Sequence, residues 1–145
     1  MATTFTIYIT TKALSTGTFT STPDLTSLLR KAYLSTLPPV STNDGFTTKI
    51  VKPKPGPVRF ISIYLNASYG NLLQTEYGDQ QDTRYMRVVV DVPMGRYAKE
   101  EKAAFLRGCM EACVLSQGKK AKECEIEVKV NEVEEADVVR KEWRE

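Results

Sequence analysis

The sequence has 145 residues, of which 41% are hydrophobic and 26% charged, a composition typical of one globular domain. The formal net charge of +2 gives no reason to expect nucleic acid or a membrane surface as a partner. No apolar run approaches the ~18 residues of a membrane-spanning helix. The three cysteines form no disulfide framework, so we expect a protein of the cytoplasm.

The first half of the chain predicts a strand, a helix and a second strand. Apolar and polar residues alternate near the start, and Thr22 with Pro23 is typical of a helix start. Prolines then end the helix and fill the loop after it. The predicted segments are a strand at 3–11, a Ser/Thr/Gly linker at 12–20, a helix from Thr22 to Pro38, a loop at 40–57 and a strand at 58–65.

The second half predicts the same order of elements. Residues 85–92 form a dense β-branched run, as expected of a strand with both faces largely covered. A Pro-Met-Gly break follows, and apolar residues at helical spacing continue to a stop at Gly118. Residues 124–130 then alternate strictly between apolar and charged, which predicts a strand with one buried face. A strand, helix and strand of these lengths predict a crossover with parallel strands.

Together these elements predict one α+β domain over residues 1–145, with two helices on a four-stranded mixed sheet. Its parts are a first β-α-β unit at 3–66, a linker at 67–84, a second unit at 85–131 and a tail at 132–145. Two architectures fit this order. One is the ferredoxin-like fold, with both helices on one face of the sheet. The other is the tautomerase fold, with two β-α-β units related by a pseudo-twofold axis.

The absence of histidine limits the chemistry. Ser-His, Cys-His and His-ligated metal sites within one chain are excluded, because the chain contains no histidine at all. Any acid or base must therefore be Asp, Glu, Lys, Tyr, Cys or the α-amino group. We expect no metal and no cofactor.

Residues 88–102, VVVDVPMGRYAKEEK, look like the tautomerase superfamily, in which a strand ends in a Gly-Arg turn before a charged helix start. Residues 126–133, IEVKVNEV, are similar to the family's closing strand. A double-length chain with dissimilar halves most resembles the cis-3-chloroacrylic acid dehalogenase group, and Thr22-Pro23 and Gly70-Asn71 fit that layout. The resemblance implies a tandem β-α-β fold and a homotrimer whose sheets surround a central axis.

The resemblance also implies a site for a small carboxylate. In the family, a proline exposed by removal of Met acts as acid, base or nucleophile beside arginines that hold the substrate. Here residue 2 is Ala2, whose primary amine would titrate near ~8 and act as a weak base. Arg96 matches the second family arginine, whereas Pro93 stands at the first. The remaining matches are Leu37 or Tyr33 in the region of the family histidine, Lys129 at the tyrosine of the last strand, and Glu134, Glu135 or Asp137 as a water-activating acid.

Each of these residues also has a plain structural interpretation. Arg96 is either a carboxylate ligand or a solvated arginine at a helix start, and Lys129 is either a substrate contact or an exposed lysine. The sequence therefore predicts a tautomerase-like protein for a small 2-oxo or unsaturated carboxylate, with weak or lost tautomerase, dehalogenase or hydratase activity. The alternative is a non-catalytic ferredoxin-like module for ligand binding or oligomerisation.

Overall fold

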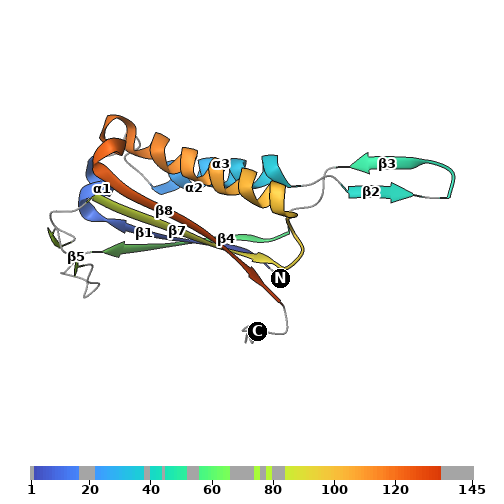
Figure 1. Ribbon diagram of the computed structural model, residues 1–145, viewed down its shortest axis with the longest axis horizontal. Helices are drawn as coiled ribbons and strands as arrows, with labels where there is room; N and C mark the ends of the chain where they lie inside the picture. The colour runs from blue at the N-terminus through green and yellow to red at the C-terminus, as the bar shows by residue number, and fades with distance from the viewer. Residues whose placement is uncertain are drawn as a thin grey trace, which may run out of the picture.

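The computed structural model describes residues 2–16, 22–37, 40–43, 45–51, 56–65, 74–75, 78–79 and 84–134. A four-stranded sheet carries two long helices on one face, and two short hairpins lie outside this sheet (Figure 1). In chain order the elements are β1 (Thr3–Thr10), α1 (Thr11–Thr16), α2 (Thr22–Thr36), β2 (Val40–Asn43), β3 (Thr48–Val51), β4 (Val58–Leu65), β5 (Gln74–Thr75), β6 (Gly78–Asp79), β7 (Arg84–Pro93), α3 (Lys99–Gln117), the 3-10 helix η2 (Gly118–Glu123) and β8 (Cys124–Val133).

The strand order of the main sheet is β4-β1-β7-β8. β1 pairs with β4 and β7 pairs with β8 in parallel, while the two central strands, β1 and β7, are antiparallel. Each β-α-β unit therefore joins two strands that are direct neighbours. This order differs from the split β-α-β arrangement of the ferredoxin-like alternative, in which another strand separates the two parallel strands. The predicted tandem β-α-β architecture with a mixed sheet is confirmed.

The core lies between the sheet and helices α2 and α3. Alternate residues of the central strands face it, so that Phe5, Ile7, Met86, Val88 and Val90 are each fully buried. Aromatic rings from both halves meet there: the residues concerned are Phe5, Tyr33, Phe60, Tyr97 and Phe105. The two helices approach closely at Gly108, where an added Cβ would lie 3.2 Å from the Ala32 Cβ.

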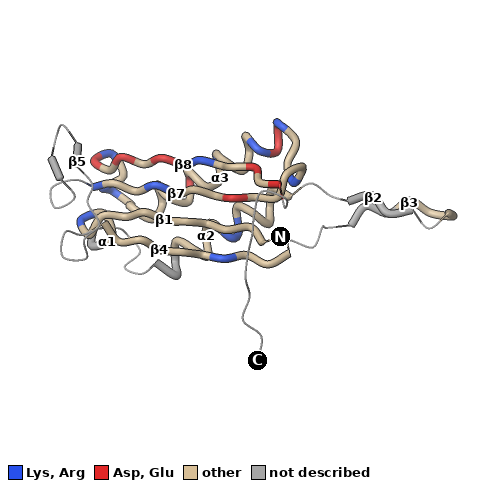
Figure 2. The backbone as a smooth tube through the Cα atoms, turned by 90° about the horizontal axis from the view of Figure 1, so that it is seen from below, with Lys and Arg blue, Asp and Glu red and all other residues tan. Residues whose placement is uncertain are grey.

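The other face of the sheet is open in the described part of the chain. Charged residues are concentrated on β7 and β8, as the coloured backbone seen from this side shows (Figure 2). Glu127 accepts a hydrogen bond from Tyr85 at 3.4 Å and lies 3.9 Å from Arg87. The residues of β7 alternate between buried and half-buried, and the half-buried ones lie on this face of the sheet.

The segment predicted as a linker at 12–20 begins with a short helix, α1. The Thr10 hydroxyl oxygen accepts the Ala13 N–H at 3.3 Å, which is the contact of an N-cap residue. That contact starts a helix in a stretch whose Thr and Ser content predicts none. The C-terminal stop predicted for the long helix is confirmed, since Gly118 has φ +57° and its N–H donates to the carbonyls of Leu115 and Val114.

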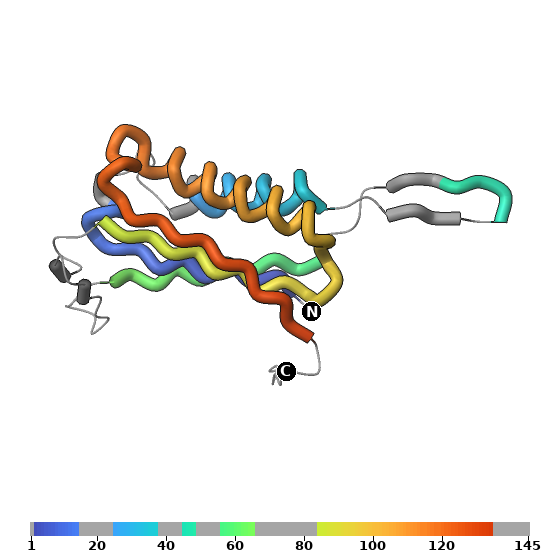
Figure 3. Tube along the Cα trace, in the orientation of Figure 1, coloured from blue at the N-terminus to red at the C-terminus, as the bar shows by residue number. Residues whose placement is uncertain are grey.

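The loop predicted at 40–57 contains a hairpin formed by β2 and β3. Its strands pair in an antiparallel register from Val40 with Val51 to Asn43 with Thr48. The turn between them includes Gly45, whose φ is +92°. The hairpin projects from the end of the molecule, away from the sheet and helices (Figures 1 and 3). The side chain of Phe46, near its tip, is 96% exposed.

Several predicted features lie outside the described residues. They are the Gly70-Asn71 pair, most of the linker at 67–84, and the tail after Glu134 with Glu135 and Asp137. None of the helices in the described ranges has the length and apolar character needed to cross a membrane.

Candidate functional site

The start of β1 and the end of β7 lie side by side because the two strands are antiparallel. Thr4 is paired with Asp91, so residue 2 lies at the level of the residues that lead into α3. Figure 3 shows the chain's beginning next to the connection between β7 and α3, and Figure 2 agrees. On the other side, the Thr3 N–H donates to the Pro57 carbonyl at 3.0 Å.

A turn after β7 carries Arg96 into this region. The Arg96 N–H donates to the Pro93 carbonyl at 3.1 Å, and Gly95 has φ +81°, a conformation that glycine adopts without strain. The half-buried Arg96 side chain lies against Gly56, where an added Cβ would be 3.8 Å from Arg96 Nη2. We call the group formed by Ala2, Thr3, Gly56, Pro57 and Arg96 the Arg96 corner.

The first turn of α3 follows Arg96 closely in the chain and has no side-chain cap. Ala98 is the N-cap residue and makes no side-chain cap hydrogen bond, so the N–H groups of the first turn lack the cap that Ser or Asp would supply. Such N–H groups and the helix dipole favour a bound anion. Glu100 and Glu101 are the acidic residues of the same turn. The Glu101 Oε2 atom is buried and accepts no hydrogen bond within the described ranges.

Hydroxyl groups on the helix side of the sheet support the start of β1. The Tyr33 hydroxyl lies 2.9 Å from Thr3 Oγ1, and the Tyr97 hydroxyl donates to the Tyr33 carbonyl at 3.2 Å. Thr36 Oγ1 lies 3.2 Å from the Tyr97 hydroxyl. Burial raises the pKa of Tyr97, so this hydroxyl stays neutral at physiological pH. The Tyr33 hydroxyl therefore contacts Thr3 directly, while the Tyr97 and Thr36 hydroxyls hold the end of α2 that carries Tyr33.

The structure brings some of the predicted site residues together and leaves one of them far from the others. Ala2 and Arg96 border the same Gly56–Pro57 segment, and Tyr33, which is fully buried, lies directly behind Thr3. Lys129 is exposed on β8, pairs with Val89 and points to the open face of the sheet. With strands ~4.8 Å apart and a rise of ~3.4 Å per residue, its Cα is roughly 16 Å from that of residue 2. One chain therefore brings together Ala2, Arg96 and Tyr33, but not Lys129.

Of the candidate acids, Glu134 is the one within the described residues. It is exposed and follows Val133, whose carbonyl accepts the Met94 N–H at 3.0 Å. The end of β8 thus contacts the turn that carries Arg96.

Sequence reasoning missed Thr3, Thr36, Tyr97 and Glu101 as parts of this region. The position of Tyr97 directly after Arg96 was the available signal for it. No signal in the sequence pointed to Thr36 or Glu101, because their positions depend on how the helices pack.

The structure gives no support for metal or thiol chemistry in the parts that it describes. No group of three or more His, Cys, Asp or Glu side chains there has the arrangement of a metal site. Cys109 and Cys113, one turn apart on α3, are core residues. Burial raises the pKa of Cys113 to about 12 and raises the pKa of Cys109 as well, so both remain thiols.

No protein-family model matches this sequence, and neither does any curated protein with which it was compared. Solved structures do match. A symmetric trimer of a fused 4-OT is 17% identical with a TM-score of 0.63, over 93% of this chain and 89% of that chain. Pt0534 inactivated by 2-oxo-3-pentynoate is 14% identical with a TM-score of 0.61, over 93% and 89%. A 5-carboxymethyl-2-hydroxymuconate delta-isomerase is 10% identical with a TM-score of 0.58, over 99% and 89%.

At these identities the likeness concerns the fold. The matches extend over nearly the whole chain, so both β-α-β units take part in them. This chain therefore has the tautomerase-like tandem β-α-β fold that its sequence predicts.

Proposed function

We propose that the protein binds a small 2-oxo or unsaturated carboxylate at the Arg96 corner and that any catalysis there is weak. The observation that carries this proposal is the antiparallel pairing of β1 and β7. It brings the start of β1 and the Arg96 guanidinium to the same Gly56–Pro57 segment.

Charge favours an anion at this place. No ion pair joins Arg96 to a carboxylate of the residues that the structure describes. A half-buried guanidinium offers two parallel N–H donors to the two oxygens of a carboxylate.

The amine of residue 2 is the group proposed to move a proton. After removal of Met1, Ala2 has a primary amine in place of the family's proline. An α-amino group titrates near ~8, so a minor fraction is unprotonated at neutral pH and accepts the enol hydroxyl proton. The ammonium then protonates the carbon next to the carbonyl, which completes an enol-to-keto conversion. A primary amine lacks the fixed ring geometry of proline, so we expect slow turnover.

The structural neighbours support this choice of substrate class and assembly. Pt0534 was inactivated by 2-oxo-3-pentynoate, an unsaturated 2-oxo carboxylate, and another neighbour is a hydroxymuconate isomerase. Fused 4-OT structures are described as trimers. We propose a homotrimer for this chain too, and a functional likeness to the dehalogenase group. In a hydratase or dehalogenase variant of the mechanism, Glu134 is the candidate among the described residues for the acid that activates water.

Substitution of residue 2 tests the proposal. The Ala2→Pro variant should gain ketonisation of phenylenolpyruvate over the wild type, because it restores a secondary amine beside Arg96. Adding Arg96→Ala to this variant should remove the gain, while Lys129→Ala, on the open face, serves as the matched control. A correctly folded Ala2→Pro protein without activity would place the reacting corner elsewhere. Carboxylate binding without any turnover in the wild type would favour a non-catalytic binding protein, the outcome expected from the missing proline.

A further inference from the structure

A carboxylate oxygen of Glu101 is buried without a hydrogen-bond donor among the described residues. Glu101 lies in the first turn of α3, a few positions after Arg96. Its Oε2 atom accepts no hydrogen bond, and its side chain is in no ion pair in the described ranges. A buried acceptor without a donor costs free energy, so native proteins rarely keep one without a reason. A ligand that brings a donor to this oxygen would remove that cost.

The fold turns the Glu101 side chain toward the end of α2. Phe105, one helical turn later on the same face of α3, is fully buried, and its ring centroid lies 5.8 Å from that of Tyr33 on α2. Tyr97, one turn earlier, stacks on Phe105 at 5.1 Å, and its hydroxyl lies 3.2 Å from Thr36 Oγ1 in the last turn of α2. Glu101 is therefore placed between two side chains that pack against α2.

The guanidinium of Arg96 reaches the same region. Burial raises the pKa of Tyr97, and the positive charge of Arg96 opposes this rise, so the guanidinium lies within electrostatic range of the Tyr97 hydroxyl. Arg96 Nη2 also lies against Gly56 at the start of β4. The Arg96 corner is thus bordered by the residues that surround Glu101.

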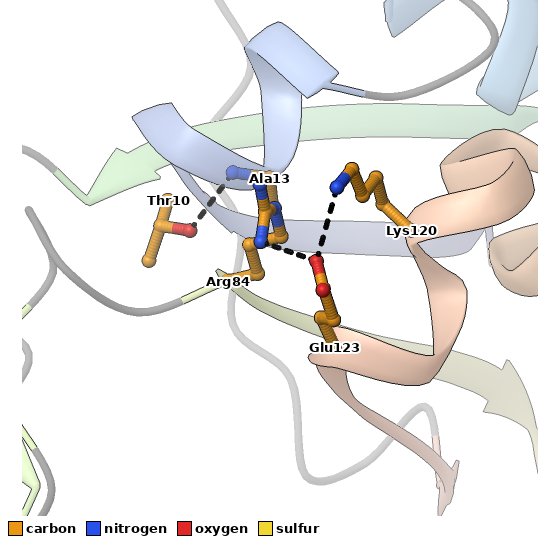
Figure 4. A network of polar contacts seen from close by, with 5 residues as sticks. All are labelled: Thr10, Ala13, Arg84, Lys120 and Glu123. Carbon is orange, nitrogen blue, oxygen red and sulfur yellow. Dashed lines mark hydrogen bonds and ion pairs between the residues drawn. The ribbon is translucent and has the colours of Figure 1, made fainter.

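An arginine and a glutamate at the opposite end of the sheet show a different arrangement. There Arg84 Nη1 lies 2.8 Å from Glu123 Oε2, an ion pair at the surface (Figure 4). Arg96 and Glu101 form no such pair with each other. In the described part of the chain, the first therefore keeps its donors and the second its acceptor, so a ligand with one carboxylate and one hydroxyl group matches both.

We propose that Glu101 is a specificity-determining residue of the Arg96 corner, accepting a hydrogen bond from a hydroxyl or enol group of the bound carboxylate. This inference rests on the proposed function, because Arg96 has to hold the ligand's carboxylate. The charge of Glu101 also repels a second carboxylate, and Pro93 stands where a second arginine would offset that repulsion. The corner then binds hydroxy- or enol-monocarboxylates and rejects dicarboxylates.

Three ligands that differ only in one substituent of phenylpropanoate test this inference by isothermal titration calorimetry. The carbon next to the carboxylate carries a hydroxyl group in phenyllactate, hydrogen in phenylpropanoate and a second carboxylate in benzylmalonate. Wild-type protein should bind phenyllactate roughly tenfold more tightly than either of the others, because an unpaired buried acceptor and two neighbouring like charges are both unfavourable.

Two substitutions of Glu101 separate its charge from its acceptor. Glu101→Gln keeps an acceptor without the charge, so it should tighten benzylmalonate binding roughly tenfold and retain the preference for phenyllactate over phenylpropanoate. Glu101→Met removes both and should bind phenyllactate and phenylpropanoate equally. Glu100→Gln is the matched control, because it removes an exposed charge from the same turn and should keep both wild-type ratios.

The outcomes distinguish this inference from the proposed function. Folded Glu101 variants with both wild-type ratios would overturn the inference, as would a wild-type protein that binds either of the other ligands as tightly as phenyllactate. Unchanged phenyllactate affinity in Arg96→Ala would contradict the proposed function, and a wild-type protein that binds none of the three ligands would contradict both. Should Glu101→Met unfold, the benzylmalonate affinity of Glu101→Gln decides the inference.

Discussion

Two corners of the sheet, the Arg96 corner and the one where Arg84 contacts Glu123 near Lys120, share a backbone plan and differ in the connection that reaches them. Between α3 and β8, the connection is the six-residue η2, which places Lys120 and Glu123 against Arg84. Between α2 and β4, a projecting hairpin intervenes and the chain returns through Gly56 and Pro57, which bring no charge to Arg96. Among the residues that the structure describes, the arginine at one end is in an ion pair and the arginine at the other end is in none. The connections, more than the sheet, decide this difference.

The largest expected effect comes from removing the arginine of each corner in turn. Arg96→Ala should weaken phenylpyruvate binding by about 10–100-fold, since hydrogen bonds to charged groups contribute about 1.5–3 kcal/mol. Arg84→Ala should change it by less than about twofold, because Glu123 already occupies that guanidinium. Isothermal titration calorimetry measures both. An equal loss of phenylpyruvate affinity in the two variants would contradict a functional difference between the corners.

The contact between the buried Tyr33 hydroxyl and Thr3 should contribute to the free energy of unfolding. Tyr33→Phe leaves the Thr3 hydroxyl without this partner and should lower the free energy of unfolding by about 1–2 kcal/mol in urea titrations. Tyr85→Phe, whose hydroxyl donates at 3.4 Å to an exposed Glu127, should cost less than about 0.5 kcal/mol. A Tyr33→Phe protein as stable as the wild type would mean that the Tyr33 hydroxyl does not hold the start of β1.

Substitution of Gly56, just before β4, tests how strongly the segment that leads into β4 is coupled to the rest of the fold. Gly56 has φ +69°, so Gly56→Ala should lower the free energy of unfolding by about 1 kcal/mol. Gly45 has φ +92° with nothing near its Cβ position, and it lies on the projecting hairpin. Gly45→Ala should therefore change the midpoint of global unfolding less. The reverse order would show that the hairpin, and not the Gly56–Pro57 segment, is coupled to the core.

The smallest effect is expected at the hairpin tip. Phe46→Ser should change the free energy of unfolding by less than about 0.5 kcal/mol, because the side chain is 96% exposed and its removal opens no cavity. Thermal unfolding followed by circular dichroism measures this. A larger loss would show that the tip is covered in the assembled protein.

The sequence predicts the main elements because their patterns are long and local. β4 matches its predicted bounds of 58–65, and the helix stop at Gly118 follows from a single glycine with positive φ. The short elements escaped prediction because one contact decides each of them. Helix α1 depends on the Thr10 cap, and the hairpin β2–β3 depends on β-branched residues around the Gly45 turn, which the nearby prolines obscured.

The candidate site was only partly visible in the sequence. Arg96 could be singled out because a Gly-Arg turn precedes a helix, but its nearness to residue 2 follows from the pairing of Thr4 with Asp91, which are 87 positions apart. Tyr33 and Lys129 show why the sequence did not decide which side chains face the site. Tyr33 is turned inward by its helical spacing, and Lys129 lies on the open face because β8 alternates.

Covalent labelling with 2-oxo-3-pentynoate tests the central claim most directly. The unprotonated amine of residue 2 should add to the alkyne carbon remote from the carbonyl, forming a C–N bond as its proton passes to the neighbouring carbon. Mass spectrometry of peptides after treatment at pH 8 should find the adduct on the amino-terminal peptide, and Arg96→Ala should reduce its rate at least tenfold. A label found only on lysine or cysteine side chains, at a rate unchanged by Arg96→Ala, would contradict a carboxylate site at the Arg96 corner.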